Sequence, residues 1–453
     1  MRDSLGVSRL TRFTRLCFLG LILSHNALVL SQAVLSSSSA SSSTSASEAA
    51  AALRAEQSSE KKDVTILVGT KTLPTDTPTG VYVSYSGKIT LPQESSSESE
   101  GTVTFTGSIS TTIASNISAT ETGAQPTNTQ PCNNYVEFCE RKYSNITVVG
   151  CHNSPFVRKG SSAANQQLDV IQQLNDGVRF LQAQMQWPTD GSNVPHFCHS
   201  SCDMLDAGPI TDWLTTVRQW VDSHPYDVVT ILLGNGNYSK ADLYAPYIEA
   251  SGILKYTYRP PFVPMALDDW PTLSEMILKG KRVVMFMDYE ANPTEYPWLL
   301  DEFSQMWESP FDPIDRAFPC VVQRPPDLSA ESATNRLYLL NHNLNAEFNL
   351  FGASILVPAV SLLNVTNGET GEGSLGNSTA QCVNSWGRPP NILNVDYYNF
   401  GNPDGSVFRV AAKYNNVTYN GSCCGRVTSD SAGVTAPALI ALGIAVVFSV
   451  LMS

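Results

Sequence analysis

The sequence predicts an α/β domain, a TIM-type (β/α)8 barrel, preceded by a Ser/Thr-rich stalk. Short apolar runs alternate with helix-patterned segments between residues 132 and 425, and this alternation is typical of parallel βα units. The segment also has a suitable length, because such barrels need roughly 250 residues. All of the chain's 10 cysteines except Cys17 fall within it. We therefore expect one folded domain over 132–425.

The strands and helices of this domain follow from hydrophobic periodicity. Strands are expected where β-branched and aliphatic residues cluster, in the runs 146–150, 178–184, 228–233, 283–287, 337–340 and 392–395. Helices are expected over 163–176, ending at Gly177, and around 213–221, ending before Pro225. In a parallel barrel the strand ends meet at one mouth, so catalytic residues should directly follow strands.

The two ends of the chain predict a secreted, surface-attached protein. Residues 1–33 combine four arginines with a short apolar core at 16–23, as in a signal peptide; a retained signal anchor is the alternative. Residues 426–453 place small residues before an apolar run at 436–452. This order predicts a glycosylphosphatidylinositol (GPI) attachment signal, with a C-terminal membrane helix as the alternative. The expected location is the extracellular face of the plasma membrane or the cell wall.

Residues 34–131 are predicted to be a mostly disordered stalk. The segment is rich in Ser and Thr, beginning with SSSSASSSTSAS at 36–47, and contains no cysteine. Such a composition buries too little apolar surface to fold and suits O-glycosylation. Three short strand-like runs, at 64–69, 81–84 and 103–106, leave a small β module open as the alternative.

The charge balance, the sequons and the cysteines indicate in which compartment the protein resides and which classes of partner it can bind. The chain has 28 Lys+Arg against 41 Asp+Glu, a formal net charge of -13, which argues against a nucleic-acid partner. Nine cysteines follow Cys17, so one is expected to stay free or to pair between chains. Cys132 with Cys139 is a plausible pair, and Cys198 with Cys202 fits a disulfide better than a zinc site. Seven N-x-S/T sequons predict a glycoprotein: Asn116, Asn145, Asn237, Asn364, Asn377, Asn416 and Asn420.

Two histidines and one aspartate follow predicted strands. His152 comes directly after the run 146–150, His199 lies in a second His-containing segment after the run 178–184, and Asp396 ends the last run. Two facing imidazoles can act as general base and general acid on a phosphodiester. A carboxylate beside the first would fix its tautomer and stabilise the imidazolium. A single histidine at a strand end is more often structural, so this pattern alone does not decide whether the two histidines are catalytic.

Several motifs together resemble phosphatidylinositol-specific phospholipase C X-domain proteins. The segments are VGCHNSPF (149–156), ANQQLDVIQQLNDGVRFLQAQMQ (164–186), HFCHSSC (196–202) and PYDVVTILLGN (225–235). They are most similar to the secreted fungal and plant branch of phospholipase-C-like phosphodiesterases. The resemblance implies a distorted (β/α)8 barrel. It also implies that His152 is the general base, His199 the general acid and Asp396 the partner of the first histidine.

The resemblance also exposes departures at the site. The family's calcium-dependent members join an Asn to acidic residues on the second and fourth strands, but this chain has Asn153 with Gln182, Gln184 and Gly234 at those places. Calcium prefers carboxylates, so no cofactor is expected. The arginine of the metal-independent members is replaced by Gln184. The alternating Gln182, Gln184 and Gln186 could form a neutral substrate-binding wall.

Arg158 and Lys159, in the loop after His152, are candidates for the positive charge that a diester transition state requires. The sequence thus predicts a phosphoric diester hydrolase that cleaves an inositol phospholipid or a related phosphodiester at the outer leaflet. One alternative is a catalytically silent barrel that serves as a cell-wall or binding protein. The other is a glycerophosphodiester or sphingolipid phosphodiesterase of the same fold.

Overall fold

The computed structural model describes residues 82–83, 85, 87–93, 129–157, 161–350, 353–421 and 423–425. Several predictions therefore lie outside the described residues. These are the signal peptide, most of the stalk with the runs 64–69 and 103–106, Asn116, the loop residues Arg158 and Lys159, and the C-terminal apolar run. Within the described ranges, no helix combines the length and the apolar character needed to cross a bilayer.

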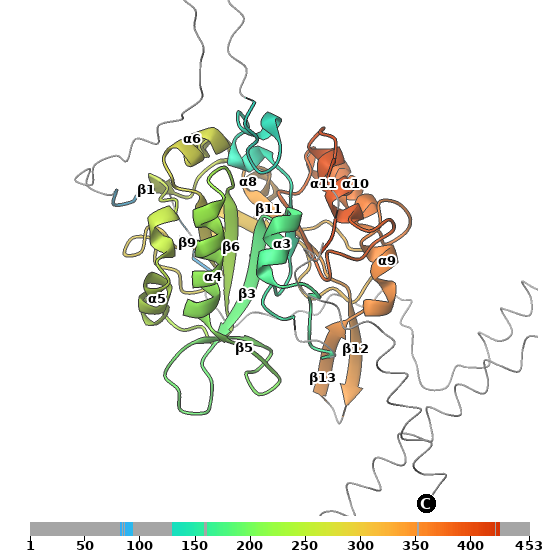
Figure 1. Cartoon of the computed structure of the whole chain (residues 1–453), viewed down its shortest axis with the longest axis horizontal. Coiled ribbons are helices and arrows are strands. Elements are labelled where there is room, and N and C mark those ends of the chain that lie inside the picture. The colour runs from blue at the N-terminus through green and yellow to red at the C-terminus, as the bar shows by residue number, and fades with distance from the viewer. Residues whose placement is uncertain are drawn as a thin grey trace, which may run out of the picture. The chain divides into compact units, whose positions relative to one another are not determined.

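Eight parallel strands form the central sheet (Figure 1). Every neighbouring pair in this path runs parallel, as expected for βα units. No ladder joins the two outer strands of the path among the described residues, so the barrel is open along one seam. The predicted distorted (β/α)8-type barrel is confirmed. The order is β10 (Met306–Glu308), β11 (Leu337–His342), β14 (Ile392–Val395), β2 (Val148–Cys151), β3 (Phe180–Gln186), β6 (Val229–Asn235), β8 (Val283–Met287) and β9 (Leu300–Asp301).

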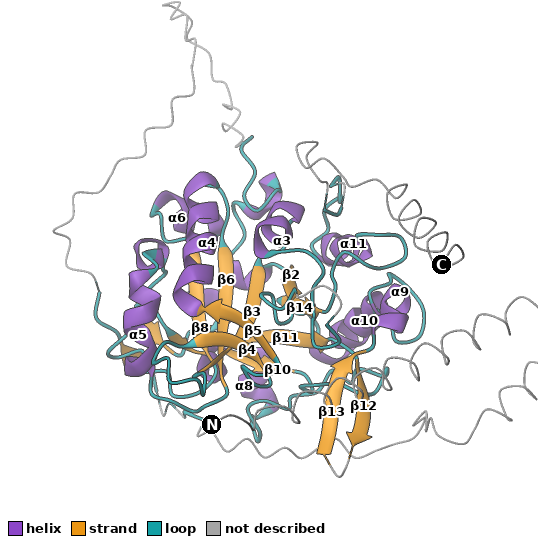
Figure 2. Cartoon of the chain, turned by 60° about the horizontal axis from the view of Figure 1, so that its bottom comes forward, coloured by secondary structure: helices purple, strands orange, loops and turns teal. Residues whose placement is uncertain are grey.

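Helices cover the outside of the sheet (Figures 1 and 2). Helix α3 is shorter than predicted, because Asp169 caps its first turn by accepting a hydrogen bond from the Gln172 amide. Residues 163–169 instead form a loop beside the barrel mouth. The α-helices are α3 (Val170–Asp176), α4 (Ile210–Ser223), α5 (Ala241–Ala250), α6 (Leu273–Leu278), α7 (Glu302–Gln305), α8 (Ala330–Thr334), α9 (Leu363–Thr366), α10 (Leu375–Trp386) and α11 (Ser406–Tyr414). Short 3-10 turns are η1 (Val136–Phe138), η2 (Tyr143–Asn145), η3 (Ile253–Tyr256), η4 (Leu267–Asp269) and η5 (Val360–Leu362).

The period of two along each strand separates two layers inside the barrel. An apolar cluster takes one residue from each of six strands, namely Phe180, Leu232, Phe286, Met306, Leu339 and Ile392. Two residues further along each strand, on the same face, stand Gln182, Gly234, Asp288, Glu308, Asn341 and Asn394. The barrel interior therefore changes from apolar to polar toward the carboxyl ends of the strands. This change places the polar chemistry at the mouth.

Three strand pairs lie beside the barrel sheet. Strand β4 (His196–His199) pairs antiparallel with the end of β3, and β5 (Leu205–Pro209) pairs antiparallel with β4. Strands β12 (Asn345–Leu350) and β13 (Ala353–Pro358) form a separate antiparallel ribbon. Strand β1 (Ile89–Thr90), from the segment expected as stalk, pairs with β7 (Phe262–Val263). Residues 82 and 83 of the strand-like run 81–84 are not in a strand.

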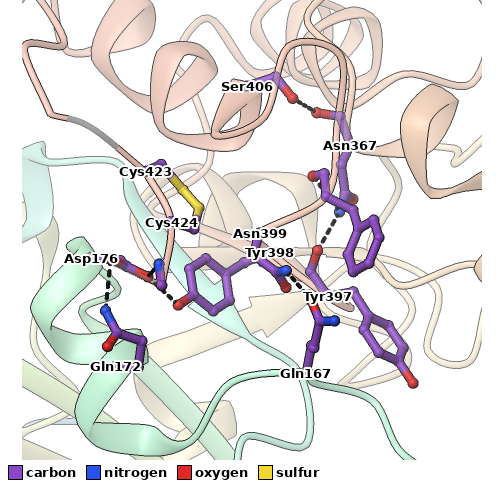
Figure 3. Close-up of a disulfide and its surroundings, with 12 residues drawn as sticks. Gln167, Gln172, Asp176, Asn367, Tyr397, Tyr398, Asn399, Ser406, Cys423 and Cys424 are labelled. Atoms are coloured by element: carbon purple, nitrogen blue, oxygen red, sulfur yellow. Dashed lines mark hydrogen bonds between the residues drawn. A yellow bond between two sulfur atoms is a disulfide. The ribbon is translucent and has the colours of Figure 1, made fainter. Parts of the chain in front are cut away.

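Four disulfides join eight cysteines of the described chain. Cys132–Cys139 and Cys198–Cys202 are the expected pairs, and Cys320–Cys382 and Cys423–Cys424 complete the set. The ninth cysteine, Cys151, is a buried free thiol. Figure 3 shows the Cys423–Cys424 pair beside helix α3, where the Asp176 carboxylate accepts hydrogen bonds from the Tyr398 hydroxyl at 2.5 Å and the Gly425 amide at 2.9 Å. This contact fixes the last described residues against the barrel.

Candidate active site

A buried histidine–aspartate pair lies at the carboxyl ends of strands β2 and β14. The two strands are neighbours in the sheet, with Cys151 opposite Val395, so the next residue of each, His152 and Asp396, reaches the mouth side by side. The His152 Nδ1 atom lies 2.8 Å from Asp396 Oδ1, and the two side chains are 5% and 2% exposed. The structure therefore brings together two of the three predicted catalytic side chains.

Two amides from the loop before α3 hold this pair. The Asn165 Nδ2 group donates to Asp396 Oδ1 at 3.1 Å. The Gln166 Nε2 group donates to the backbone oxygens of His152 at 2.8 Å and Val395 at 3.0 Å, tying β2 to β14. Both amide side chains are buried. Sequence reasoning assigned residues 163–176 to a helix and missed this role, which the Asp169 cap could have indicated.

His199 ends strand β4 and lies beside the loop that follows His152. Its ring packs edge-on against Phe156, which lies in the loop after His152, with ring centroids 5.3 Å apart. Its Nδ1 atom lies 3.2 Å from the Ser200 hydroxyl. Phe156 thus links His199 to the loop that follows His152.

The surroundings shift the pKa values of the two imidazoles in opposite directions. Burial lowers the pKa of His152, but the charge and hydrogen bond of Asp396 outweigh it, and the pKa is raised above its ordinary value. Burial, and secondly the charge of His152, lower the pKa of His199 to about 4. The surroundings therefore shift the two pKa values apart, upward for His152 and downward for His199.

The predicted polar wall points into the barrel, but its amides are partly used internally. Gln182 Oε1 accepts a hydrogen bond from Asn394 Nδ2 at 2.9 Å, and Gln186 Nε2 donates to the Cys198 oxygen at 3.3 Å. The Gln184 carboxamide lies over Gly234, in the space that a Cβ atom would fill. Gln182 thus supports the barrel, whereas Gln184 is half-buried nearer the opening.

These positions do not fit a calcium ion. Asn153 turns its amide to Asn165 Oδ1 at 3.3 Å, and Gln182 is engaged by Asn394. Neither of them, nor Gln184 or Gly234, supplies a carboxylate, which calcium sites favour. Within the described ranges, no group of three or more His, Cys, Asp and Glu residues could hold a metal ion.

An arginine that the sequence did not single out lies in the polar layer of the barrel. The Arg324 guanidinium pairs with Glu308 at 3.0 Å and with Asp288 at 3.5 Å, and it donates to the Tyr289 hydroxyl at 3.0 Å. Burial raises the pKa of Asp288 to about 6, although Arg324 opposes the shift. The arginine therefore balances buried carboxylates and is not a free cation.

The neighbouring residues Asp312 and Asn343 complete the mouth. The Asn343 Nδ2 atom lies 3.5 Å from His152 Nε2, the ring nitrogen that Asp396 leaves free. Asp312, in the loop after β10, has a positive φ of 50°. Burial raises its pKa while the charges of His152 and Arg324 oppose the rise. The Asn343 amide thus lies beside the ring nitrogen of His152 that Asp396 leaves free, and neither Asn343 nor Asp312 was predicted.

Known proteins resemble this chain in sequence. The family model PI-PLC X 1 matches residues 138–415, more than half of the chain. An uncharacterized secreted protein of Arthroderma benhamiae is 55% identical over 321 residues, covering 70% of this chain and 72% of the relative. The PI-PLC X domain-containing protein 1 of the same organism is 40% identical over 272 residues, covering 60% and 86%.

Among solved structures, a phosphatidylinositol-specific phospholipase C from Listeria monocytogenes matches with a TM-score of 0.36 and 14% sequence identity. The match covers 62% of this chain and 96% of that one. The family model spans β2 through α11 and therefore includes His152, His199 and Asp396. On the evidence of this sequence match, the chain belongs to the PI-PLC X family.

Proposed function

We propose that this protein is a phosphoric diester hydrolase that cleaves a phosphodiester in a lipid headgroup by acid–base catalysis of His152 and His199. The observation that carries the proposal is the buried His152–Asp396 pair, with Nδ1 and Oδ1 2.8 Å apart. Asp396 occupies Nδ1, so the Nε2 atom of His152 is the one that can exchange a proton with a substrate.

In this mechanism His152 accepts the proton of a hydroxyl that attacks phosphorus. The bond between phosphorus and the leaving oxygen breaks as the new phosphorus–oxygen bond forms, and His199 donates a proton to the leaving oxygen. If the attacking hydroxyl belongs to the headgroup, as in inositol, the products are a cyclic phosphodiester and a neutral glyceride. The imidazolium formed at His152 is stabilised by Asp396.

The protonation of the free site constrains this assignment. The pKa of His199 is lowered to about 4, whereas that of His152 is raised. A bound diester anion beside the rings favours their charged forms, so it raises the pKa of His199 toward the range in which this ring can donate a proton. Arg324 cannot contact the diester, because Glu308 and Asp288 hold its guanidinium. His152, His199 and the amide donors around them therefore supply the polar contacts to the bound diester.

The engagement of Arg324 also motivates a second candidate, a catalytically silent barrel that binds a ligand at the mouth. A diester transition state requires positive charge, and the Arg324 guanidinium is held by Glu308 and Asp288. The third candidate is a phosphodiesterase in which the same residues act on a glycerophosphodiester or a sphingolipid headgroup. Attachment to the outer leaflet through residues 426–453 belongs to the proposal as well.

The test is an assay of the secreted full chain on phosphatidylinositol, lysophospholipid and glycerophosphodiester substrates, with and without a chelator. We expect turnover that survives the chelator and is lost in His152→Ala and His199→Ala but not in His196→Ala. If wild-type protein releases no product from any diester above the His152→Ala background, the hydrolase proposal is rejected in favour of the silent barrel. Turnover abolished by the chelator would overturn the metal-independent mechanism.

A further inference from the structure

Asn343 directly follows strand β11, and its side chain lies beside the proposed catalytic base. The last residue of β11, His342, is the ladder partner of Val395 on β14, so the next residues, Asn343 and Asp396, lie close together at the carboxyl ends of these strands. The Asn343 Nδ2 atom lies 3.5 Å from His152 Nε2, and the Asn343 side chain is buried. Asp396 and Asn343 thus contact the two different nitrogens of one imidazole ring.

The backbone of Asn343 is held by the residues on both sides of it along the chain. The ring of His342 stacks on Phe318, with ring centroids 3.7 Å apart, and its Nε2 atom lies 3.1 Å from the Ser378 hydroxyl. On the other side, the Asn345 Nδ2 group donates to the Asn343 backbone oxygen at 3.1 Å. The backbone of Asn343 is therefore fixed by contacts that do not involve its own side chain.

The carboxamide of Asn343, in contrast, has no firm partner in the fold. Its Oδ1 atom is buried without a hydrogen bond to any described residue, and its Nδ2 contact with His152, at 3.5 Å, is at the long limit of a hydrogen bond. The buried amide of Asn415 accepts from the Thr147 amide at 2.9 Å and donates to the Thr147 oxygen at 2.7 Å. Because an unsatisfied buried polar group costs free energy, a ligand explains the Asn343 carboxamide better than the fold does.

We propose that Asn343 is a further catalytic residue, whose Nδ2–H group donates a hydrogen bond to a non-bridging phosphoryl oxygen of the diester in the transition state. The inference rests on the proposed function, because it assigns a donor to the reaction of His152. A diester transition state needs hydrogen-bond donors or cations at its non-bridging oxygens. The Arg324 guanidinium is held by Glu308 and Asp288, so a neutral amide beside the base supplies this contact.

The protonation of His152 determines when the Asn343 N–H group is free. With Nδ1–H directed at Asp396, the neutral ring accepts a hydrogen bond only at Nε2. The attacking hydroxyl must therefore replace Asn343 at this atom before it loses its proton. Once Nε2 has taken that proton, it is a donor and no longer accepts from Asn343. The N–H group is thus free in the step in which negative charge increases on the phosphoryl oxygens, and an interaction made only then raises kcat.

Orientation of the His152 ring is the other role that this contact can serve. Asp396 already orients the ring, because its Oδ1 atom lies 2.8 Å from Nδ1. The contact of Asn343 at 3.5 Å adds little to that and occupies the nitrogen that the reaction needs. The attacking oxygen and the non-bridging oxygens become bonded to the same phosphorus, so a short movement of the Asn343 carboxamide brings Nδ2 from the ring to the phosphoryl group.

The test compares Asn343→Ala with Asn335→Asp in the full chain. Asn335 lies at the other end of the same strand, two residues before β11. Its Oδ1 atom accepts a hydrogen bond from the Leu267 amide at 3.3 Å, which an aspartate retains. On the best diester substrate we expect Asn343→Ala to lower kcat about 100-fold and to change KM less than about threefold, and Asn335→Asp to change neither. A loss of kcat below about threefold in Asn343→Ala would overturn the inference.

Sulfur substitution in the substrate separates donation to the phosphoryl group from a loss of folding. A phosphorothioate diester carries sulfur, a weak hydrogen-bond acceptor, in place of one non-bridging oxygen. The wild-type chain should cleave one of the two diastereomers at least about tenfold more slowly than the oxygen substrate, and Asn343→Ala should reduce this ratio to under about threefold. An equal ratio in the two proteins would overturn the inference and leave the roles of His152 and His199 as proposed.

A failure of the proposed function gives a different result. If the wild-type chain cleaves no diester, binding of dimethyl phosphate, measured by isothermal titration calorimetry, takes the place of the kinetics. Binding that is at least about tenfold weaker in Asn343→Ala than in Asn335→Asp would reject the hydrolase proposal and keep the Asn343 contact. Equal binding by the two variants, or no binding by the wild-type chain, would overturn the inference as well.

Discussion

Two histidine–aspartate pairs in this molecule have the same length but different surroundings. His152–Asp396 and His196–Asp206 each place Nδ1 and a carboxylate oxygen 2.8 Å apart. The first pair is 5% and 2% exposed, the second 16% and 32%. The first also has the buried amides of Asn165 and Gln166 around it. The distance is therefore the same in both pairs, and it is the burial and the neighbouring side chains that distinguish the proposed catalytic pair.

The comparison is tested most strongly by removing each imidazole. His152→Ala should lower kcat/KM on the best diester substrate about 1000-fold, because the general base is lost. His196→Ala should change it less than about twofold, because His196 is not one of the proposed catalytic residues and its pair with Asp206 is partly exposed. Initial rates measured over a range of substrate concentrations give kcat/KM for each variant. Equal losses in the two variants would show that the exposed pair is also part of the site.

The same principle can be tested on arginines by the free energy of unfolding. Arg324→Met should destabilise the fold by about 3–5 kcal/mol, because Glu308 and Asp288 would remain buried without a partner. Arg218→Met removes an ion pair of only 2.5 Å with Asp222, but on a partly exposed helix surface, so the expected loss is under about 1 kcal/mol. Urea unfolding followed by circular dichroism gives both values. A smaller loss for Arg324→Met than for Arg218→Met would contradict the role of burial.

The third test replaces the carboxylate of each histidine–aspartate pair by a neutral amide of the same shape and compares the loss of stability. Asp396→Asn should cost about 2 kcal/mol of unfolding free energy, because the buried imidazolium of His152 loses its charged acceptor. Asp206→Asn should cost less than about 1 kcal/mol. Thermal unfolding at pH 6, where His152 is charged, is the suitable measurement. The difference should shrink at higher pH as His152 loses its proton, and a constant difference would show that the charge of His152 is not involved.

The smallest expected effect is the dependence of kcat/KM on pH. One histidine must be neutral and the other protonated. Below about pH 4, where His199 is also protonated, no base remains. Above the raised pKa of His152, no acid remains. We therefore expect a bell-shaped profile with its acid limb near pH 4 and its alkaline limb above 6.5, each changing about tenfold per pH unit. A profile that is flat from pH 4 to 9 would contradict the two-histidine mechanism.

The strands of the barrel could be predicted because buried parallel strands are nearly continuous apolar runs. The run 283–287 matches β8 at both ends, and 392–395 matches β14. His152 and Asp396 were found by their place after such runs. The placement of Gln182 inside the barrel also followed from the period of two.

The parts that the sequence did not reveal depend on long-range contacts. Arg324 lies in an irregular segment between β10 and α8, and only the fold brings it to Glu308 and Asp288. Asn165 and Asn343 are loop residues without periodicity. The β12–β13 ribbon carried an alternating pattern that could have been recognised, NAEFNL at 345–350, but short alternations of this kind are common in loops.

The pairing of β1 with β7 has a consequence for proteolysis. The Leu91 amide donates to the Pro261 oxygen at 2.9 Å, Lys88 pairs with Asp269 at 2.8 Å, and Leu91 is buried. No cysteine lies between residues 34 and 131. A protease that cut the chain between residues 94 and 128 would therefore leave two fragments held only by non-covalent contacts. They would migrate together under native conditions and separate in denaturant without any reductant.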